Sequence, residues 1–227
     1  MRTNRGAAVR DPTTFTQRKR REQLLGCAID VIVDHGFQGM SVGEVARRAG
    51  VSKGVVTYHF AVKDDLVYEV VAQIFDSITE FLESRLGRTT PGTFVADYLT
   101  AWIEYYRTHT RYMLAIGEIW SNFRDETGRR RFGEHAVEGE LASVERALEL
   151  GQGDGSRGQF STRVMAVTMK AALDALLGQL ADDPELDLEA YGDELVALFE
   201  RATRANPIDV HTQASDASAS LTRKQQA

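Results

Sequence analysis

The sequence predicts an all-α protein, and three observations support that fold class. Apolar residues recur at helical spacing through almost all of residues 18–204. The chain shows no sustained two-residue alternation and no Asn-Gly or Asp-Gly turn between apolar runs, so strand signals are missing. Hydrophobic residues make up 43% of the 227 residues, which is enough to bury a core. We therefore expect about nine helices, arranged as an N-terminal three-helix unit followed by a larger helical body.

The first predicted helix covers residues 18–35. Its apolar residues at positions i, i+3, i+4, i+7 and i+8 share one face. These residues are Leu25, Ala28, Ile29, Ile32 and Val33. Gly36 follows at the position just beyond the helix, where a residue that tolerates positive φ commonly ends it.

A short helix is predicted next, over residues 42–49. Ser41 and Glu44 have the spacing of a capping box, in which the serine hydroxyl accepts from a free N–H of the first turn and the glutamate reaches back. Gly50 ends this helix after only two turns.

A second short helix is predicted over residues 53–60, with Ser52 as its N-cap. The turn Gly50-Val51-Ser52 joins the two short helices in a helix-turn-helix geometry. In that geometry the second helix fits the major groove of DNA and the first braces it across the backbone. A plain helical corner in another all-α protein would show the same local pattern.

A long fourth helix is predicted from Lys63 to about Leu86, with Asp64 and Asp65 placed favourably in its first turn. Its apolar face consists of Leu66, Val70, Ile74, Ile78 and Leu82. The break at residues 87–92 is the best boundary between structural units. Five further helices are predicted at residues 93–108, 110–123, 131–150, 161–181 and 187–204.

Segments rich in glycine and polar residues are predicted to lie outside the helices. Residues 151–158 contain four glycines and are expected to form a flexible connector. We divide the chain into a flexible basic arm (1–17), a helix-turn-helix domain (18–64), a helical ligand-binding and dimerisation domain (65–205) and a disordered tail (206–227).

Charge is distributed unevenly along the chain. The net charge is −6, but residues 1–63 carry +6 and the remaining 164 residues carry −12. A basic end on an acidic body suggests that the end meets a polyanion while the body has another task. A solvated, basic helix start would give the same excess.

Composition excludes several classes of protein. No run approaches the ~18 consecutive apolar residues of a membrane span, and no apolar run follows the basic N-terminus, so we expect a cytoplasmic protein with no membrane partner. The single cysteine, Cys27, excludes a disulfide framework and a cysteine-based zinc site. Nucleophile-elbow, Walker and zinc-protease motifs are missing. We therefore expect no enzyme activity, no metal and no cofactor.

Four landmarks follow one another between residues 18 and 66, namely Gly36-Phe37, the Ala46–Ser52 turn, the Tyr58-His59-Phe60 triplet and the Lys63–Leu66 run. In this order they resemble the TetR family of transcriptional regulators. The resemblance covers under a quarter of the chain, and it implies a DNA-binding head and a small-molecule-binding body. Gly43 departs from the pattern, since many relatives carry a long polar residue there.

The resemblance also implies roles for individual residues. On the recognition helix, groove-facing positions would be Lys53, Gly54, Val55, Thr57 and Tyr58, able to reach base edges or thymine methyl groups. Phosphate contacts would come from Ser41, Arg47, Arg48, Tyr58, His59 and Lys63. Alternatives remain open: Tyr58 and Phe60 could pack between helices, and His59 could cap its helix. Arg2, Arg5 and Arg10 of the arm could enter a minor groove or stay idle.

Aromatic residues concentrate in residues 94–123, which hold eight of the nineteen in the chain. Such clusters are usually ordinary core, but the excess favours an aromatic-lined cavity for a largely apolar or aromatic effector. The candidate ligand-binding residues are Tyr98, Trp102, Tyr105, Tyr106, Met113, Ile116, Trp120, Phe123, Met165 and Met169. Arg111 and Glu118 are expected to meet water. Asp174 is either a pocket carboxylate or a residue at the edge of an interface, and we favour the interface edge.

The last two helices suit dimerisation, and in the TetR family two such helices from each chain form a four-helix interface. Small or apolar residues recur there at helical spacing. The candidates are Ala171, Ala175, Gly178, Tyr191, Leu195, Leu198 and Ala202. The sequence thus predicts a homodimeric repressor that binds a palindromic double-stranded DNA operator and is released by a small-molecule effector. The alternative is a DNA-binding architectural or adaptor protein of the same fold without an effector.

Overall fold

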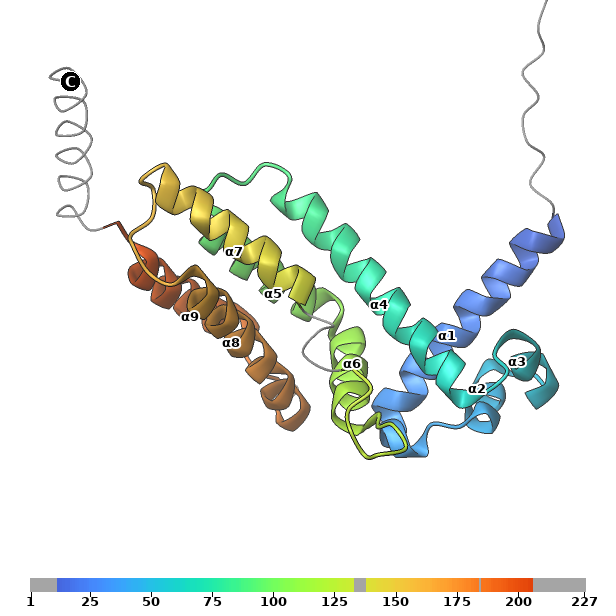
Figure 1. Ribbon diagram of the computed structural model, residues 1–227. Coiled ribbons are helices and arrows are strands. Elements are labelled where there is room, and N and C mark those ends of the chain that lie inside the picture. Colours follow the sequence, from blue (N-terminus) through green and yellow to red (C-terminus); the bar gives the residue numbers. More distant parts are fainter. Residues whose placement is uncertain (1–11, 133–137, 184, 206–227) are drawn as a thin grey trace, which may run out of the picture.

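The computed structural model describes residues 12–132, 138–183 and 185–205, and this part of the chain forms nine α-helices (Figure 1). They are α1 (Pro12–Gly39), α2 (Val42–Ala49), α3 (Lys53–His59), α4 (Lys63–Leu86), α5 (Phe94–Thr108), α6 (Thr110–Asn122), α7 (Glu138–Gly153), α8 (Thr162–Asp182) and α9 (Leu188–Thr203). Two isolated bridges, Arg124 with Arg130 and Arg157 with Arg204, are the only β-type pairings in the described residues. The all-α prediction is confirmed.

The helices form a small head and a larger body (Figure 1). The head consists of α1–α3, and α4 runs from the head along the body, where α5, α7, α8 and α9 pack together. The apolar face predicted for α4 is buried at Leu66, Val70, Ile74 and Ile78. Because α6 packs against α1, the body touches the head directly as well as through α4.

Helix α1 is longer than predicted. It begins at Pro12 rather than at residue 18, so residues 12–17, expected in the flexible arm, are helical. Gly36 interrupts it with φ 71° and ψ 167°, which confirms the predicted need for positive φ. Arg2, Arg5 and Arg10 of the arm, and the tail at residues 206–227, lie outside the described residues.

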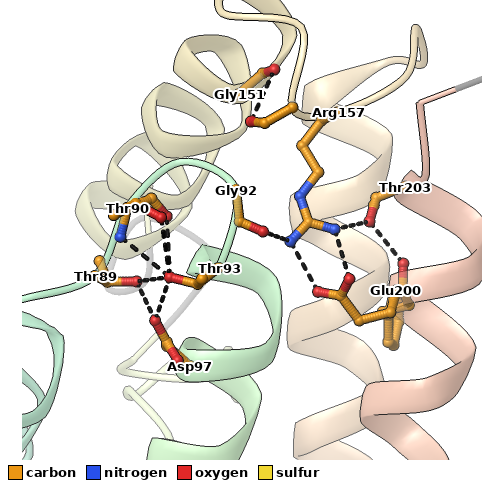
Figure 2. Close-up of polar contacts among 11 residues, drawn as sticks. Thr89, Thr90, Gly92, Thr93, Asp97, Gly151, Arg157, Glu200 and Thr203 are labelled. Atoms are coloured by element: carbon orange, nitrogen blue, oxygen red, sulfur yellow. Dashed lines mark hydrogen bonds and ion pairs between the residues drawn. The ribbon is translucent and has the colours of Figure 1, made fainter.

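The predicted connector at residues 151–158 is partly wrong, because residues 151–153 belong to α7 and only the remaining residues lie between α7 and α8. Helix α7 is described from Glu138 through Gly153, and residues 133–137 of the helix predicted at 131–150 lie outside the described residues. Arg157 is then only 4% exposed and ties together three parts of the body (Figure 2). Its guanidinium donates to both carboxylate oxygens of Glu200 (2.9 and 2.8 Å), to Thr203 Oγ1 (2.9 Å) and to the Gly92 carbonyl oxygen (2.5 Å). A buried, multiply bonded arginine holds this loop in place.

Of the described helices, α8 alone is long and apolar enough to cross a membrane by length and composition. Core helices pass the same test. One face of α8 is buried against the body at Ala166, Met169, Leu173, Leu176 and Leu180. Its exposed face carries Val164 and Val167, which leaves an apolar surface.

Candidate nucleic-acid interface and internal cavity

The two short helices of the head have the predicted caps, with two differences. Ser41 Oγ accepts from the Glu44 amide at 3.1 Å, but the Glu44 carboxylate binds Arg47 Nε at 3.0 Å instead of reaching back to the N-cap. Gly50 ends α2 in the left-handed region (φ 66°, ψ 32°). Ser52 has the backbone angles of an N-cap, yet within the described residues its hydroxyl makes no capping hydrogen bond.

The outer face of α3 is open, as a groove-reading helix requires. Lys53, Gly54, Thr57 and Tyr58 are exposed, with Tyr58 exposed to 73% of its surface. Inter-helix packing of Tyr58 is therefore wrong. Val55 is half-buried beside these residues. The predicted readout residues lie together on one accessible surface.

The inner side of α3 fixes that helix in the head. Val56 and Phe60 are buried, and packing of Phe60 between helices is confirmed. The His59 carbonyl oxygen accepts from Arg21 Nη1 at 3.0 Å. Burial, reinforced by Arg21 and Arg20, lowers the pKa of the His59 imidazole, so this ring is neutral at neutral pH.

The cationic side chains that were predicted to contact phosphates differ in how far they are already engaged by partners within the chain. Arg47 is exposed and, within the described residues, forms its ion pair with its helical neighbour Glu44. Arg48 has partners on α1, with 2.7 Å between Arg48 Nη1 and Asp34 Oδ2. Lys63 Nζ donates to the Phe37 carbonyl oxygen at 3.1 Å, and burial lowers the pKa of this ammonium. Arg48 and Lys63 would have to exchange these partners to hold a phosphate.

Sequence reasoning assigned no contact to the start of α1, which lies beside α3. Gln17 Nε2 is 3.5 Å from the Tyr58 hydroxyl. The exposed cations Arg18, Lys19 and Arg20 follow directly along α1. The charge excess at this end of the chain was the available signal, and it widens the basic surface around the recognition helix.

A partly open cavity of about 940 Å³ lies between helices of the body and the end of α1, within the size range of small-molecule sites. Of the ten predicted ligand-binding residues, five line it. They are Trp102, Tyr106, Met113, Ile116 and Trp120. The wall also includes residues from the head-proximal helices, namely Val33 and Gly36 of α1 and Phe75 and Ile78 of α4.

The other five predicted ligand residues serve the core around the cavity instead. The Tyr98 hydroxyl donates to Glu140 Oε1 at 2.6 Å, and the Tyr105 hydroxyl donates to Ser77 Oγ at 3.0 Å. Burial raises the pKa of Tyr105 to about 12. Phe123 packs on Phe37, with ring centroids 5.5 Å apart, and Met165 and Met169 pack in the core of α8.

Sequence reasoning missed most of the charged part of the lining. Asp174 lines the cavity and pairs with Lys170, which confirms the alternative of a pocket carboxylate, while its place at the edge of a dimer interface stays a prediction. Glu140 also lines the cavity, and burial raises the pKa of its carboxyl group. These residues come from α7 and α8, and only the packing of those helices against α5 and α6 brings them to one space.

Arg111 and Glu118, both expected to meet water, contact the head. Arg111 Nε donates to Asp30 Oδ1 at 2.8 Å and Nη2 to Asp34 Oδ1 at 3.0 Å. Glu118 lines the cavity, and its Oε2 accepts from the Phe37 amide at 3.0 Å. The Arg111 side chain is nevertheless 47% exposed, so its predicted solvent contact is confirmed, whereas Glu118 is half-buried and directs its carboxylate to the Phe37 amide.

The predicted dimer residues form a largely exposed surface on α8 and α9. Ala171, Ala175, Gly178 and Ala202 are exposed, as is Leu198 at 53%. Tyr191 is half-buried and Leu195 is buried. In the described part of the chain, no three His, Cys, Asp or Glu side chains gather as a possible metal site.

Comparison with known proteins places the head in a family. The family described as "Bacterial regulatory proteins, tetR family" matches residues 24–70. The HTH-type transcriptional activator FasR of Mycolicibacterium smegmatis is 39% identical over 72 residues, which span 32% of this chain and 33% of FasR. The curated similarity thus covers about a third of either protein.

Solved structures extend the likeness to the body. A TetR-family transcriptional regulator from Rhodococcus sp. aligns with a TM-score of 0.70 and 22% identity, over 80% of this chain and 97% of that one. The regulator FadR from Bacillus subtilis, solved with stearoyl-CoA, aligns with a TM-score of 0.64 and 18% identity, over 78% and 96%. At these identities the structures establish a shared fold. Residues 24–70 thus carry the helix-turn-helix domain of the TetR family of transcriptional regulators, and the nine described helices have the fold of solved TetR-family regulators.

Proposed function

We propose that this chain is a homodimeric repressor whose affinity for a palindromic operator falls when a small, largely apolar or aromatic effector fills the internal cavity. The observation that carries the proposal is the composition of the cavity wall. Trp120 of α6 and Leu177 of α8 line it together with Gly36 of α1 and Phe75 of α4. A molecule in this space therefore touches the DNA-binding head and the body at once.

The surface of the head supports operator binding. Lys53, Thr57 and Tyr58 stand on the open face of α3, where a major groove can reach them. Exposed Arg47, Lys19 and Arg20 surround that face and can neutralise phosphates. Base contacts would set the operator sequence, and phosphate contacts would make the affinity depend on salt.

The exposed faces of α8 and α9 support a homodimer. Apolar surface is exposed to solvent on the last two helices, at Val167 and Ala175 of α8 and at Leu198 and Ala202 of α9. Contact with a second copy would cover this surface and pair two heads about a two-fold axis, which matches a palindromic operator.

Both tryptophans of the chain, Trp102 and Trp120, line the cavity, so intrinsic fluorescence reports directly on its occupancy. An effector that fits the wall is mostly apolar, with one polar group for the Glu140 and Lys170 end. Because the similar FadR structure holds stearoyl-CoA, long-chain acyl-CoA thioesters belong in the first compound panel.

The test begins with selection of bound fragments from genomic DNA by the purified protein, repeated across a salt series. We expect one palindromic site, with affinity lost in Lys53→Ala and retained in the control Glu80→Ala, whose residue lies on α4 away from α3. Purely salt-driven binding without a preferred site would favour the alternative, a DNA-binding architectural protein.

A further inference from the structure

We propose that Glu118 is the residue through which the cavity controls the head, acting through its hydrogen bond to the Phe37 amide. This inference rests on the proposed function, because it assigns a route between the effector cavity and the recognition helix. Glu118 would be a positioning residue that acts on DNA affinity without touching DNA.

Glu118 is exposed to the cavity and bonded to the head by the same carboxylate. It lines the cavity next to Gly117 and Ser121 of α6. Its Oε2 accepts from the Phe37 N–H at 3.0 Å, across 81 residues of sequence. The neighbouring Gly36 also lines the cavity, and a Cβ built there would lie 3.6 Å from Glu118 Oε2. An occupant of the cavity therefore meets both sides of this hydrogen bond.

Phe37 joins three parts of the molecule. Its N–H binds Glu118 of α6, and its carbonyl oxygen accepts from Lys63 Nζ at 3.1 Å, at the start of α4. The same carbonyl oxygen accepts from the Met40 amide at 3.3 Å, in the turn that leads into α2. The Lys63 ammonium also lies 4.5 Å from the centroid of the Phe37 ring. A shift of Phe37 would be passed to α2 and α4 together.

A second polar contact joins α6 to the head. Arg111 binds Asp30 and Asp34 of α1, and Arg48 of α2 binds the same two carboxylates, at 3.7 and 2.7 Å. Arg111 and Glu118 are seven residues apart on α6, which is about two turns or ~10.5 Å. Two contacts at this separation fix the direction of α6 relative to α1 and α2.

The direction of control follows from these contacts. With the cavity open, the bond from Glu118 to Phe37 holds the head at a fixed orientation on the body. An occupant that displaces the Glu118 carboxylate leaves the Phe37 amide without its acceptor, so the head loses one of these two polar contacts between it and α6. Operator affinity should fall, provided that the occupant binds better to this second state.

The experiment compares Glu118→Ala, Glu118→Gln and the control Glu104→Gln on the operator selected by the wild-type chain. Glu104 is also a partly exposed carboxylate of the body, bound to Arg85 at the end of α4 remote from the head. Without any added compound, Glu118→Ala should bind the operator roughly tenfold more weakly, within the 5- to 150-fold range typical of coupled sites. Glu118→Gln keeps an acceptor oxygen and should retain most of the affinity, and Glu104→Gln should retain all of it.

Amide hydrogen exchange at Phe37 provides the second readout. We expect slow exchange in the wild-type chain and faster exchange in Glu118→Ala, with thermal melting confirming that the variant is folded. Wild-type operator affinity in Glu118→Ala, or unprotected Phe37 in the wild-type chain, would overturn the proposal. If the wild-type chain selects no operator, the proposed function fails instead, and the exchange data still decide whether the hydrogen bond forms.

Discussion

Replacement of Arg157 by methionine should destabilise the body strongly, because this arginine anchors the loop between α7 and α8 to neighbouring elements. The substitution keeps an unbranched apolar stem of similar length but removes the guanidinium. Glu200 then loses its bidentate hydrogen bonds from the guanidinium, and Thr203 Oγ1 and the Gly92 carbonyl oxygen each lose a hydrogen-bond donor (Figure 2). These groups belong to α9 and to the turn before α5, so both elements lose an anchor.

The magnitude follows from burial. Breaking a buried ion pair by removing one partner costs about 3–5 kcal/mol. The Glu200 side chain is 36% exposed, so water partly compensates the carboxylate, and the lower value of about 3 kcal/mol applies. For a chain of about this size, each kcal/mol corresponds to about 2–4 °C in Tm, which gives a drop of about 6–12 °C.

Thermal unfolding followed by circular dichroism, at one fixed protein concentration, measures this drop. Arg146→Met is the matched control, because Arg146 is 74% exposed and lies 3.7 Å from Glu149 on the surface of α7. The control should change Tm by under about 2 °C. A similar small change in Arg157→Met would refute the conclusion that this arginine anchors the loop.

Three further predictions concern packing and charge. Gly158→Ala should lower stability by about 1–3 kcal/mol in urea unfolding, because its Cβ would lie 2.5 Å from the Arg204 carbonyl oxygen, whereas Gly153→Ala meets nothing within 4 Å and should be neutral. Hydrogen bonding to Arg111 lowers the pKa of Asp34, so the stability that this carboxylate contributes is present above its ordinary pKa and is lost as the pH falls through the lowered value. Asp34→Asn should flatten the acid limb of the stability profile, and an unchanged limb would contradict the pairing. Burial raises the pKa of Glu140, so its ionised form costs stability at pH 7. Glu140→Gln should raise Tm at pH 7, and the gain should vanish toward pH 4; a lower Tm at pH 7 would count against this reading.

The head could be predicted from sequence almost residue by residue, because its signals are local. Gly36 and Gly50 adopt positive φ where the sequence placed helix ends, and Ser41 caps α2. Helices α2 and α3 begin at the predicted residues, and α3 ends one residue early. Each of these features depends on neighbours within four positions along the chain.

The body could be predicted only in outline, because its details depend on packing between distant helices. Tyr98, Trp102, Tyr105 and Tyr106 share one helical stripe, yet only Trp102 and Tyr106 reach the cavity. The packing of α7 and α8 decides which of these side chains face the cavity. The periodicity of apolar residues within α5 does not contain that information. Arg157 was missed for the same reason, since its partner Glu200 lies 43 residues away.

The most direct test of the account is the operator affinity of the wild-type chain with and without a compound that saturates the fluorescence change of Trp102 and Trp120. Fluorescence anisotropy of a labelled operator duplex at fixed salt measures this affinity, and the tryptophan signal shows that the cavity is occupied. The account predicts that affinity falls by roughly 5- to 150-fold when the cavity is filled. An unchanged operator affinity with the cavity fully occupied would contradict it.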